Sequence, residues 1–240
     1  RTPTRANRAL SAIKKLMNWY VMRGDIETSP VALLRPPSPE VPRDRVLNDD
    51  EIRAIWRQAE IESYPFGPFL KLLMMTGQRR TEVSAMRWSE LNLDEGIWEL
   101  PASRVKNARL HIVPLPPRAV ELLHSLHRFL DSDFVFTTTG RSAISGFGRL
   151  KERVDSALPD GTPDWRFHDF RRTASTGMAK IGVMPHVIDA VTNHKSGVVS
   201  GVGATYNRYT YLNEKREALE LWSENLTQLT NSPSQKSGTV

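Results

Sequence analysis

The chain has 240 residues, of which 39% are hydrophobic, and its 33 Lys and Arg against 27 Asp and Glu give a net charge of +6. This length can bury one full core and carry a second small lobe, and the basic balance favours a polyanionic partner without proving one. The sequence contains no cysteine, which excludes disulfides and thiolate metal sites. Its apolar runs are too short to cross a bilayer and no signal peptide precedes them, so we expect a cytoplasmic protein.

The first segment is basic and is predicted to be helical. Residues 1–38 hold seven Lys or Arg and two acidic residues, so 7 − 2 = +5 of the net charge lies there, and we expect this lobe to touch phosphate non-specifically. Apolar residues recur at helical spacing from Ala6 to Met22, and Gly24 ends the pattern. The chain opens with Arg1 and runs straight into this pattern, so we expect a fragment of a longer protein.

A proline-rich segment follows the first helix. Four prolines and then three charged residues predict an extended linker, and we place a domain boundary at residues 36–46. Beyond it, Asn48 with Glu51 three residues later forms a capping-box pattern that opens a helix. The nearly all-apolar residues 66–75 predict a central helix. Further helices are predicted at residues 117–130, 143–157, 168–181, 185–192 and 213–229, and the polar residues 230–240 predict a disordered tail.

Two short extended segments interrupt the helices. Residues 96–100 and 110–115 have strand-like composition and are joined by a polar stretch, which predicts a β-hairpin. No internal repeat is present. We therefore expect a mainly α fold with one small antiparallel β-sheet, in a main domain at residues 47–229.

Two segments place basic side chains where helices start. Arg79 lies at one such start, and Glu82 three residues on can hold it; a guanidinium at a helix N-terminus attracts phosphate. His168 and Arg171 stand three apart at the start of another helix, so one can share a proton while the other clamps an oxygen. For either segment alone, an ordinary surface ion pair or a solvated basic helix start stays open as an alternative.

The order of these segments along the chain indicates the function more specifically than any single segment does. Lys106 lies in the predicted hairpin turn, and Tyr206 follows His194 by twelve residues. With the two helix starts, these residues resemble the tyrosine recombinase (phage integrase) family, whose pattern of Thr-Gly-x-Arg-x-x-Glu, hairpin Lys, His-x-x-Arg, His or Trp, and Tyr is present in order. The run Ala-Thr-Tyr-Asn-Arg at residues 204–208 is similar to prophage integrases in particular, and the resemblance covers about residues 6–225.

The resemblance implies the tyrosine recombinase catalytic fold at residues 47–229, with residues 1–35 as the closing helices of a truncated core-binding domain. It implies a site-specific recombinase that integrates or excises a prophage or genomic island by cleaving and rejoining DNA through a 3′-phosphotyrosyl bond. The implied partner is a double-stranded attachment site, bound by a homotetramer that is a monomer in isolation, with accessory DNA-bending or excision factors and no membrane. The implied location is the cytoplasm of a bacterial host, on chromosomal or phage DNA.

The resemblance also assigns roles to single residues. Tyr206 is the nucleophile, because the Tyr-Asn-Arg context selects it over Tyr209 and Tyr211, which spacing alone would not exclude. The other implied roles are charge neutralisation by Arg79 and Arg171, proton acceptance by His168, general acid catalysis by Lys106, a phosphate hydrogen bond from His194 and support of the first arginine by Glu82. Bond energy is retained in such a reaction, so we expect no cofactor, neither ATP nor metal.

Several alternatives stay open. The same chemistry would serve a type IB-like nicking-rejoining topoisomerase, and a decayed integrase would be a catalytically weak DNA-binding accessory fragment. The sequence has no Walker loop, no His-Glu-x-x-His and no clustered acidic pair, which argues against a metal-dependent nuclease. His124 and His127 are better explained as one exposed helix face than as metal ligands. The helix at residues 214–222 either docks on a neighbouring subunit or packs on its own chain.

Overall fold

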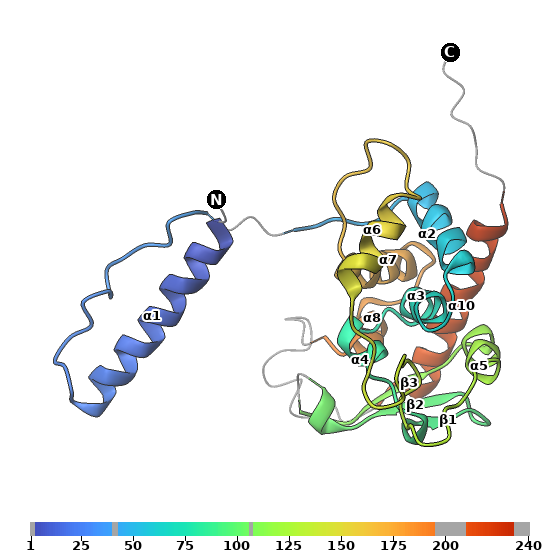
Figure 1. Ribbon diagram of the computed structural model, residues 1–240, viewed down its shortest axis with the longest axis horizontal. Coiled ribbons are helices and arrows are strands. Elements are labelled where there is room, and N and C mark those ends of the chain that lie inside the picture. The colour runs from blue at the N-terminus through green and yellow to red at the C-terminus, as the bar shows by residue number, and fades with distance from the viewer. Residues whose placement is uncertain (1–2, 40–42, 106–107, 195–209, 233–240) are drawn as a thin grey trace, which may run out of the picture. The chain divides into compact units, whose positions relative to one another are not determined.

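The computed structural model describes residues 3–39, 43–105, 108–194 and 210–232 (Figure 1). The chain divides into two compact units, Arg1–Asp44 and Arg45–Val240. The division falls within the proline-rich segment at residues 36–46.

The first unit contains helix α1 (Pro3–Arg23) and an extended segment that returns along it. Gly24 ends the helix with a φ of +79°, a left-handed conformation that glycine adopts without steric penalty. The buried Asn7 side chain donates to the Ser38 carbonyl at 2.8 Å and accepts from the Ser38 backbone N–H at 3.2 Å. The described part of this unit therefore has one helix, where the resemblance implied more than one.

The first two helices of the second unit pack against each other. α2 (Asp49–Ile61) begins as predicted, because the Glu51 N–H donates to Asn48 Oδ1 at 2.9 Å and the Asn48 N–H donates to Glu51 Oε2 at 2.8 Å. α3 (Phe66–Thr76) is confirmed as the central helix, since eight of its 11 residues are buried. Gly77 ends α3 with a φ of +61° and turns the chain toward the next helix.

A three-stranded antiparallel sheet follows, in the order β1-β2-β3. β2 (Ile97–Leu100) pairs with β3 (His111–Pro114), so the predicted hairpin is confirmed. β1 (Leu91–Asn92) was not predicted, because two residues are too few to show an alternating pattern. The 3₁₀-helices beside the sheet are η1 (Trp88–Glu90) and η2 (Ala102–Arg104). Residues 106–107 of the hairpin lie outside the described part of the chain.

The other helices in the described ranges of the second unit surround these elements or extend from them. In chain order they are α4 (Arg80–Ser84), α5 (Pro117–His124), α6 (Phe147–Asp155), α7 (Phe167–Lys180), α8 (Pro185–Thr192) and α10 (Leu212–Asn231). The expected mainly α fold with a small antiparallel sheet is therefore confirmed. None of the helices in the described ranges is long and apolar enough to cross a membrane.

Two helices are shorter than their patterns predicted. α5 stops at His124 instead of residue 130, because Ser125 Oγ donates to a carbonyl one turn back at 2.7 Å and the chain turns away, leaving Leu130 fully exposed. α6 starts at Phe147 instead of residue 143, because Gly146 has a φ of +83°, which is incompatible with a helix.

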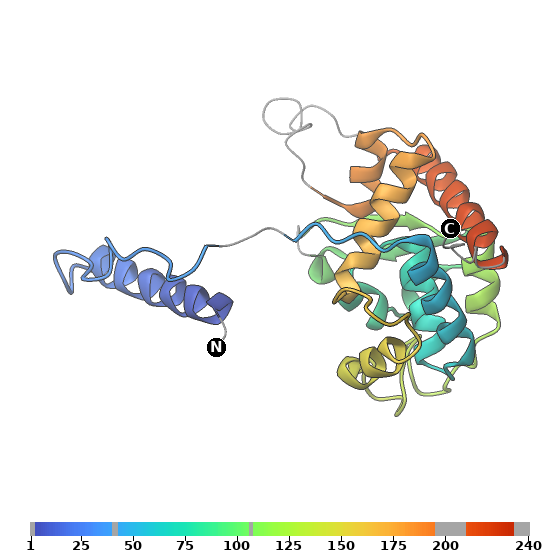
Figure 2. The ribbon, with the colours of Figure 1, turned by 90° about the horizontal axis from the view of Figure 1, so that it is seen from above.

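The long helix α10 runs along one side of the second unit (Figures 1 and 2). It packs against α2, α3, α7, α8 and β3, and its buried Trp222 donates an indole N–H to the Met74 carbonyl at 2.9 Å. In this single chain the helix therefore packs on its own domain. It continues through Asn231, so Thr230 and Asn231 are helical instead of belonging to the predicted tail, and residues 233–240 lie outside the described residues.

The contact between α7 and α10 leads to a stability prediction. A Cβ added at Gly177 would lie 2.1 Å from Trp222 Cζ3. Overpacking a core costs about 1–3 kcal/mol, which exceeds the ~1 kcal/mol that alanine gains over glycine in a helix. We expect Gly177→Ala to lower the Tm in thermal unfolding, by roughly 2–4 °C for each kcal/mol lost.

Gly148→Ala on α6 is the matched control, because no atom lies within 4 Å of a Cβ added there. It should leave the Tm unchanged or raise it, through helix propensity alone. Equal losses of Tm in the two variants would show that the Trp222 contact does not limit the size of residue 177.

Candidate active site

Arg79 is held between two helices at the end of the turn that follows α3. Its backbone N–H donates to Glu82 Oε2 at 3.0 Å and its Nη1 donates to Glu82 Oε1 at 2.7 Å. Glu82 is only 2% exposed, so the pair is largely buried and is not the surface pair of the alternative interpretation. Nη2 donates to the Asn193 carbonyl at 3.3 Å, which joins this arginine to the end of α8.

Arg171 lies on α7 and is also buried, at 6% exposure. Its Nη1 donates to the Gly77 carbonyl at 3.1 Å, while its Nη2 is buried without a hydrogen-bond partner among the described residues. Burial, and after it the nearby charge of Arg79, lowers the pKa of Arg171 to about 10, so the side chain is still a cation at neutral pH. Two close guanidinium groups and an unused buried N–H make an arrangement that an anion would stabilise.

His168 lies one turn before Arg171, in the first turn of α7. Burial lowers its pKa, and the positive charges of Arg172 and Arg171 lower it further. The imidazole is therefore mainly neutral at neutral pH and can accept a proton.

His194 follows α8 directly, after the left-handed residue Asn193 with a φ of +46°. Its Nδ1 lies 3.9 Å from Asp189 Oδ1, and its side chain is 65% exposed. Because the Asn193 carbonyl accepts from Arg79, the neighbouring His194 belongs to the same part of the molecule. Four of the six predicted catalytic residues thus come from the start of α4, the first two turns of α7 and the end of α8.

Lys106 and Tyr206 lie outside the described residues. Just before the first of them, Arg104 forms an ion pair with Glu90 and donates from Nη2 to the Glu82 carbonyl at 2.9 Å. This contact ties the hairpin to the residue that orients Arg79. The sequence analysis did not predict the role of Arg104, because its partners lie 14 and 22 positions away and no short pattern reveals them.

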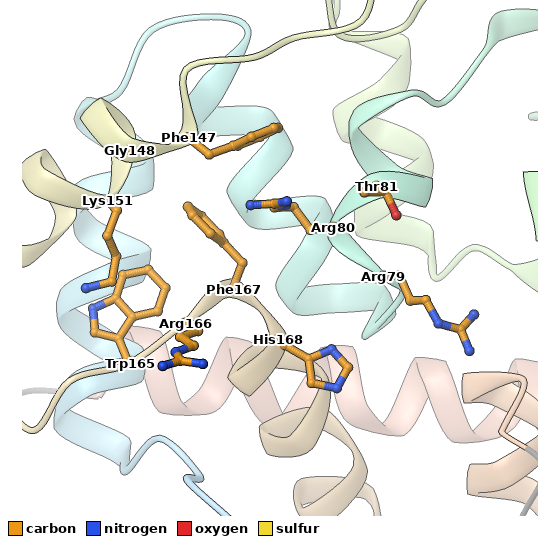
Figure 3. A pocket seen from close by; sticks show the side chains of 10 residues that line it. All are labelled: Arg79, Arg80, Thr81, Phe147, Gly148, Lys151, Trp165, Arg166, Phe167 and His168. Carbon is orange, nitrogen blue, oxygen red and sulfur yellow. The ribbon is translucent and has the colours of Figure 1, made fainter. Parts of the chain in front are cut away.

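A cavity of about 560 Å³ adjoins Arg79 and His168 (Figure 3). Its wall contains aromatic rings and several cations that the sequence analysis did not single out; the further lining residues are Arg80, Thr81, Phe147, Gly148, Lys151, Trp165, Arg166 and Phe167. Figure 3 shows that the side chains of Arg79, just before α4, and Arg80, its first residue, point in different directions and that Arg80 points to the aromatic rings. The Arg80 guanidinium lies 4.7 Å from the ring centre of Phe147 and 5.9 Å from that of Phe167.

Of the two tyrosines that rival Tyr206, Tyr211 lies within the described residues. Tyr211 precedes α10 with a φ of +50°, and its ring centre lies 5.3 Å from that of His186. Tyr209 lies outside the described residues. Within the described ranges, no three His, Cys, Asp or Glu side chains are grouped so that they could hold a metal ion.

Known proteins resemble this chain in sequence and in fold. Prophage integrase IntZ of Escherichia coli (strain K12) is 30% identical over 164 residues, which cover 65% of this chain and 38% of IntZ. The chain thus spans about two-fifths of the length of this curated relative. A crystal structure of a lambda integrase dimer bound to a COC′ core site has a TM-score of 0.62 at 21% identity, covering 83% of this chain and 75% of that one.

A second lambda integrase structure, a tetramer bound to a Holliday junction, has a TM-score of 0.60 at 21% identity and covers 81% of this chain and 60% of that one. At 21% identity, the similarity to these two structures shows a shared fold. The sequence match to the Phage integrase family extends over residues 45–216. With most of its length inside that match, the chain belongs to the phage integrase family of tyrosine recombinases.

Proposed function

We propose that this chain is the catalytic part of a site-specific recombinase that cleaves and rejoins duplex DNA, with Tyr206 as the nucleophile. The observation that supports it most directly is the pair of guanidinium groups on Arg79 and Arg171. Arg171 donates to the Gly77 carbonyl, Arg79 follows Gly77 by two residues, and the charge of Arg79 is close enough to lower the pKa of Arg171. The guanidinium group of Arg171 keeps a buried N–H without a partner among the described residues. A phosphodiester is the anion that such a planar fork fits.

The proposed reaction begins with neutralisation of charge on the non-bridging oxygens of the phosphate. Arg79 and Arg171 supply the donors, and a donor of this kind is typically worth ~10²- to 10³-fold in rate. The tyrosine hydroxyl has an ordinary pKa of about 10, so its attack requires a proton acceptor. His168 fits that role because its lowered pKa leaves it neutral.

Attack by the Tyr206 oxygen forms a 3′-phosphotyrosyl bond and breaks the bond to the 5′ oxygen. Lys106 is the proposed general acid for that leaving oxygen, and His194 the proposed hydrogen-bond donor to the phosphate. A 5′-hydroxyl from a partner duplex then attacks the phosphotyrosine and releases the enzyme. Each step exchanges one phosphoester for another, so the proposed reaction consumes no ATP and assigns no step to a metal.

The proposed substrate is an attachment site in chromosomal or phage DNA of a bacterial cytoplasm, and the proposed assembly is a tetramer formed on two duplexes from subunits that are monomeric without DNA. The prophage integrase relative and the lambda integrase structures, which are described as a dimer on a core site and a tetramer on a Holliday junction, support this assignment. Size-exclusion with and without DNA tests it; a complex with one subunit on each duplex would argue against the tetramer.

Trapping of a covalent intermediate tests the proposed activity. The substrate is a pool of nicked duplexes with randomised sequence. Cleavage near the nick releases a short fragment that carries the 5′-hydroxyl, so the protein–DNA adduct cannot be reversed. We expect an adduct on denaturing gels, formed in excess EDTA, and mass spectrometry should place the DNA on Tyr206. Absence of an adduct would contradict the proposal, and relaxation of plasmids of any sequence would indicate a topoisomerase instead.

Arg80 gives a separate prediction about DNA affinity. Its guanidinium is exposed, is oriented by Phe147 and Phe167, and forms no ion pair among the described residues. We expect it to contact a backbone phosphate beside the scissile one. Arg80→Gln should then weaken binding to all DNA sequences and reduce the slope of log affinity against log salt by about 1.

Arg149→Gln is the charge-matched control, since Arg149 is exposed on α6 and does not line the cavity. Its salt slope, measured by fluorescence anisotropy with the same labelled duplex, should stay near that of the parent protein. An equal change in both variants would mean that Arg80 acts only through net charge.

A further inference from the structure

Lys215 is a buried cation that the proposed chemistry does not use. It lies in the first turn of α10, is 4% exposed, and its Nζ donates to the Ile112 carbonyl of β3 at 2.5 Å. No carboxylate forms an ion pair with it in the described part of the chain. Within the described ranges, the side chain of this lysine is therefore attached to the sheet through a backbone carbonyl.

Burial of the positive charge of this lysine opposes the stability of the fold. A buried ammonium group without a carboxylate partner is unfavourable, and burial lowers the pKa of Lys215 to about 8. A positive charge in the first turn of a helix is also opposed by the helix dipole. An apolar side chain of similar length would avoid both penalties, and buried charges can often be replaced in this way without loss of stability.

The strand that receives this hydrogen bond is connected to the candidate active site. His111, next to Ile112 on β3, is 6% exposed, and its Nε2 lies 3.2 Å from the Val191 carbonyl. Because a carbonyl can only accept, Nε2 carries the proton of a neutral ring. Gln78 Nε2 donates to the same carbonyl at 2.8 Å, and Gln78 directly precedes Arg79.

The charges of these groups are also close enough to act on one another. Burial, and after it the positive charge of Lys215, lowers the pKa of His111 to about 3. Arg171 and Arg79 contribute further in the same direction. The Lys215–Ile112 contact therefore borders the cationic site, on the side of the sheet.

The two ends of this contact belong to the segments that hold the remaining proposed catalytic residues. Lys106 lies five positions before His111, and Tyr206 lies nine positions before Lys215. One hydrogen bond therefore joins the strand that follows the proposed general acid to the helix that follows the proposed nucleophile. Their relative position matters, because a misplacement of ~1 Å can reduce a rate by about 10²-fold.

We propose that Lys215 is a positioning residue for DNA cleavage, because it holds α10, which follows the proposed nucleophile in the sequence, in register with β3, which follows the proposed general acid. The inference rests on the proposed function. It assigns Lys215 no contact with the DNA, since the side chain is buried and its ammonium group is bound to Ile112.

Lys215→Met tests the inference, because it removes the ammonium group and keeps a side chain of similar length. The assay is the single-turnover rate of covalent adduct formation at saturating DNA, with duplexes recovered from the randomised pool. We expect a rate loss of about 10²-fold, together with an unchanged affinity for the duplex and an unchanged or higher Tm. A purely structural role would instead lower Tm and affinity along with the rate.

Arg216→Met is the matched control. Arg216 is the next residue of α10 and also donates to a backbone carbonyl near the sheet, that of Glu95 at 3.0 Å, but this bond is exposed. Its loss should leave the cleavage rate close to that of the parent protein. A rate for Lys215→Met no lower than that of Arg216→Met would overturn the inference.

Lys215→Gln decides the case if the Met variant does not fold, because it removes the charge and keeps a shorter donor. A folded Gln variant with normal affinity should cleave more slowly than Arg216→Met, and an equal rate would overturn the inference. Failure of the parent protein itself to form an adduct would refute the proposed function, whereas parent and Lys215 variants that cleave equally would refute the positioning role alone.

Discussion

Tyr206→Phe is expected to form no covalent product with nicked duplexes, while its affinity for the same DNA stays that of the parent protein. The hydroxyl oxygen is the atom that would bond to phosphorus, and phenylalanine lacks only that oxygen. The loss should therefore be complete instead of partial. The measurement is adduct formation on denaturing gels, set beside duplex affinity from fluorescence anisotropy.

Tyr209→Phe and Tyr211→Phe are the controls, because these tyrosines are the rivals for the same role. Both variants should still form adduct, with the DNA on Tyr206. Tyr211 is already engaged at the start of α10, where its ring packs beside His186. Adduct formation by Tyr206→Phe, or its loss only in Tyr209→Phe or Tyr211→Phe, would move the nucleophile to another position.

Arg171→Lys should slow cleavage by about 10²- to 10³-fold, which is the loss typical of one oxyanion donor. Lysine keeps the charge but has no planar fork, so it cannot donate to the Gly77 carbonyl and to a phosphate oxygen with the same geometry. Duplex affinity should change little, because the charge is retained. The expected signature in single-turnover kinetics is thus a lower maximal rate at an unchanged DNA concentration for half-saturation.

Arg172→Lys is the matched control, since it makes the same substitution at the next residue of α7. Arg172 donates to Asp169 at 2.9 Å, and its side chain is 34% exposed, so lysine can keep the ion pair. We expect a rate close to that of the parent protein. If Arg171→Lys also cleaves at the parent rate, Arg171 does not contact the phosphate in the transition state.

Contacts and patterns among residues close in the sequence were sufficient to predict most of the fold. The capping box of Asn48 and Glu51 is a contact between residues three apart, so its pattern predicted the start of α2 correctly. The apolar run of α3 and the hairpin of β2 and β3 were equally local. The order of the four catalytic segments was also sufficient to identify the family, which the match at residues 45–216 confirms.

Only the tertiary structure decided which groups share the site and what they contact. Arg171 donates to Gly77 across 94 positions of sequence, Arg79 to Asn193 across 114, and Lys215 to Ile112 across 103. Contacts between residues so far apart in the sequence produce no periodic pattern, because each depends on how helix ends and a strand pack together in the folded domain. Burial, which lowers the pKa of His168 and that of Lys215, likewise comes from packing and not from the identity of the residues nearby in the chain.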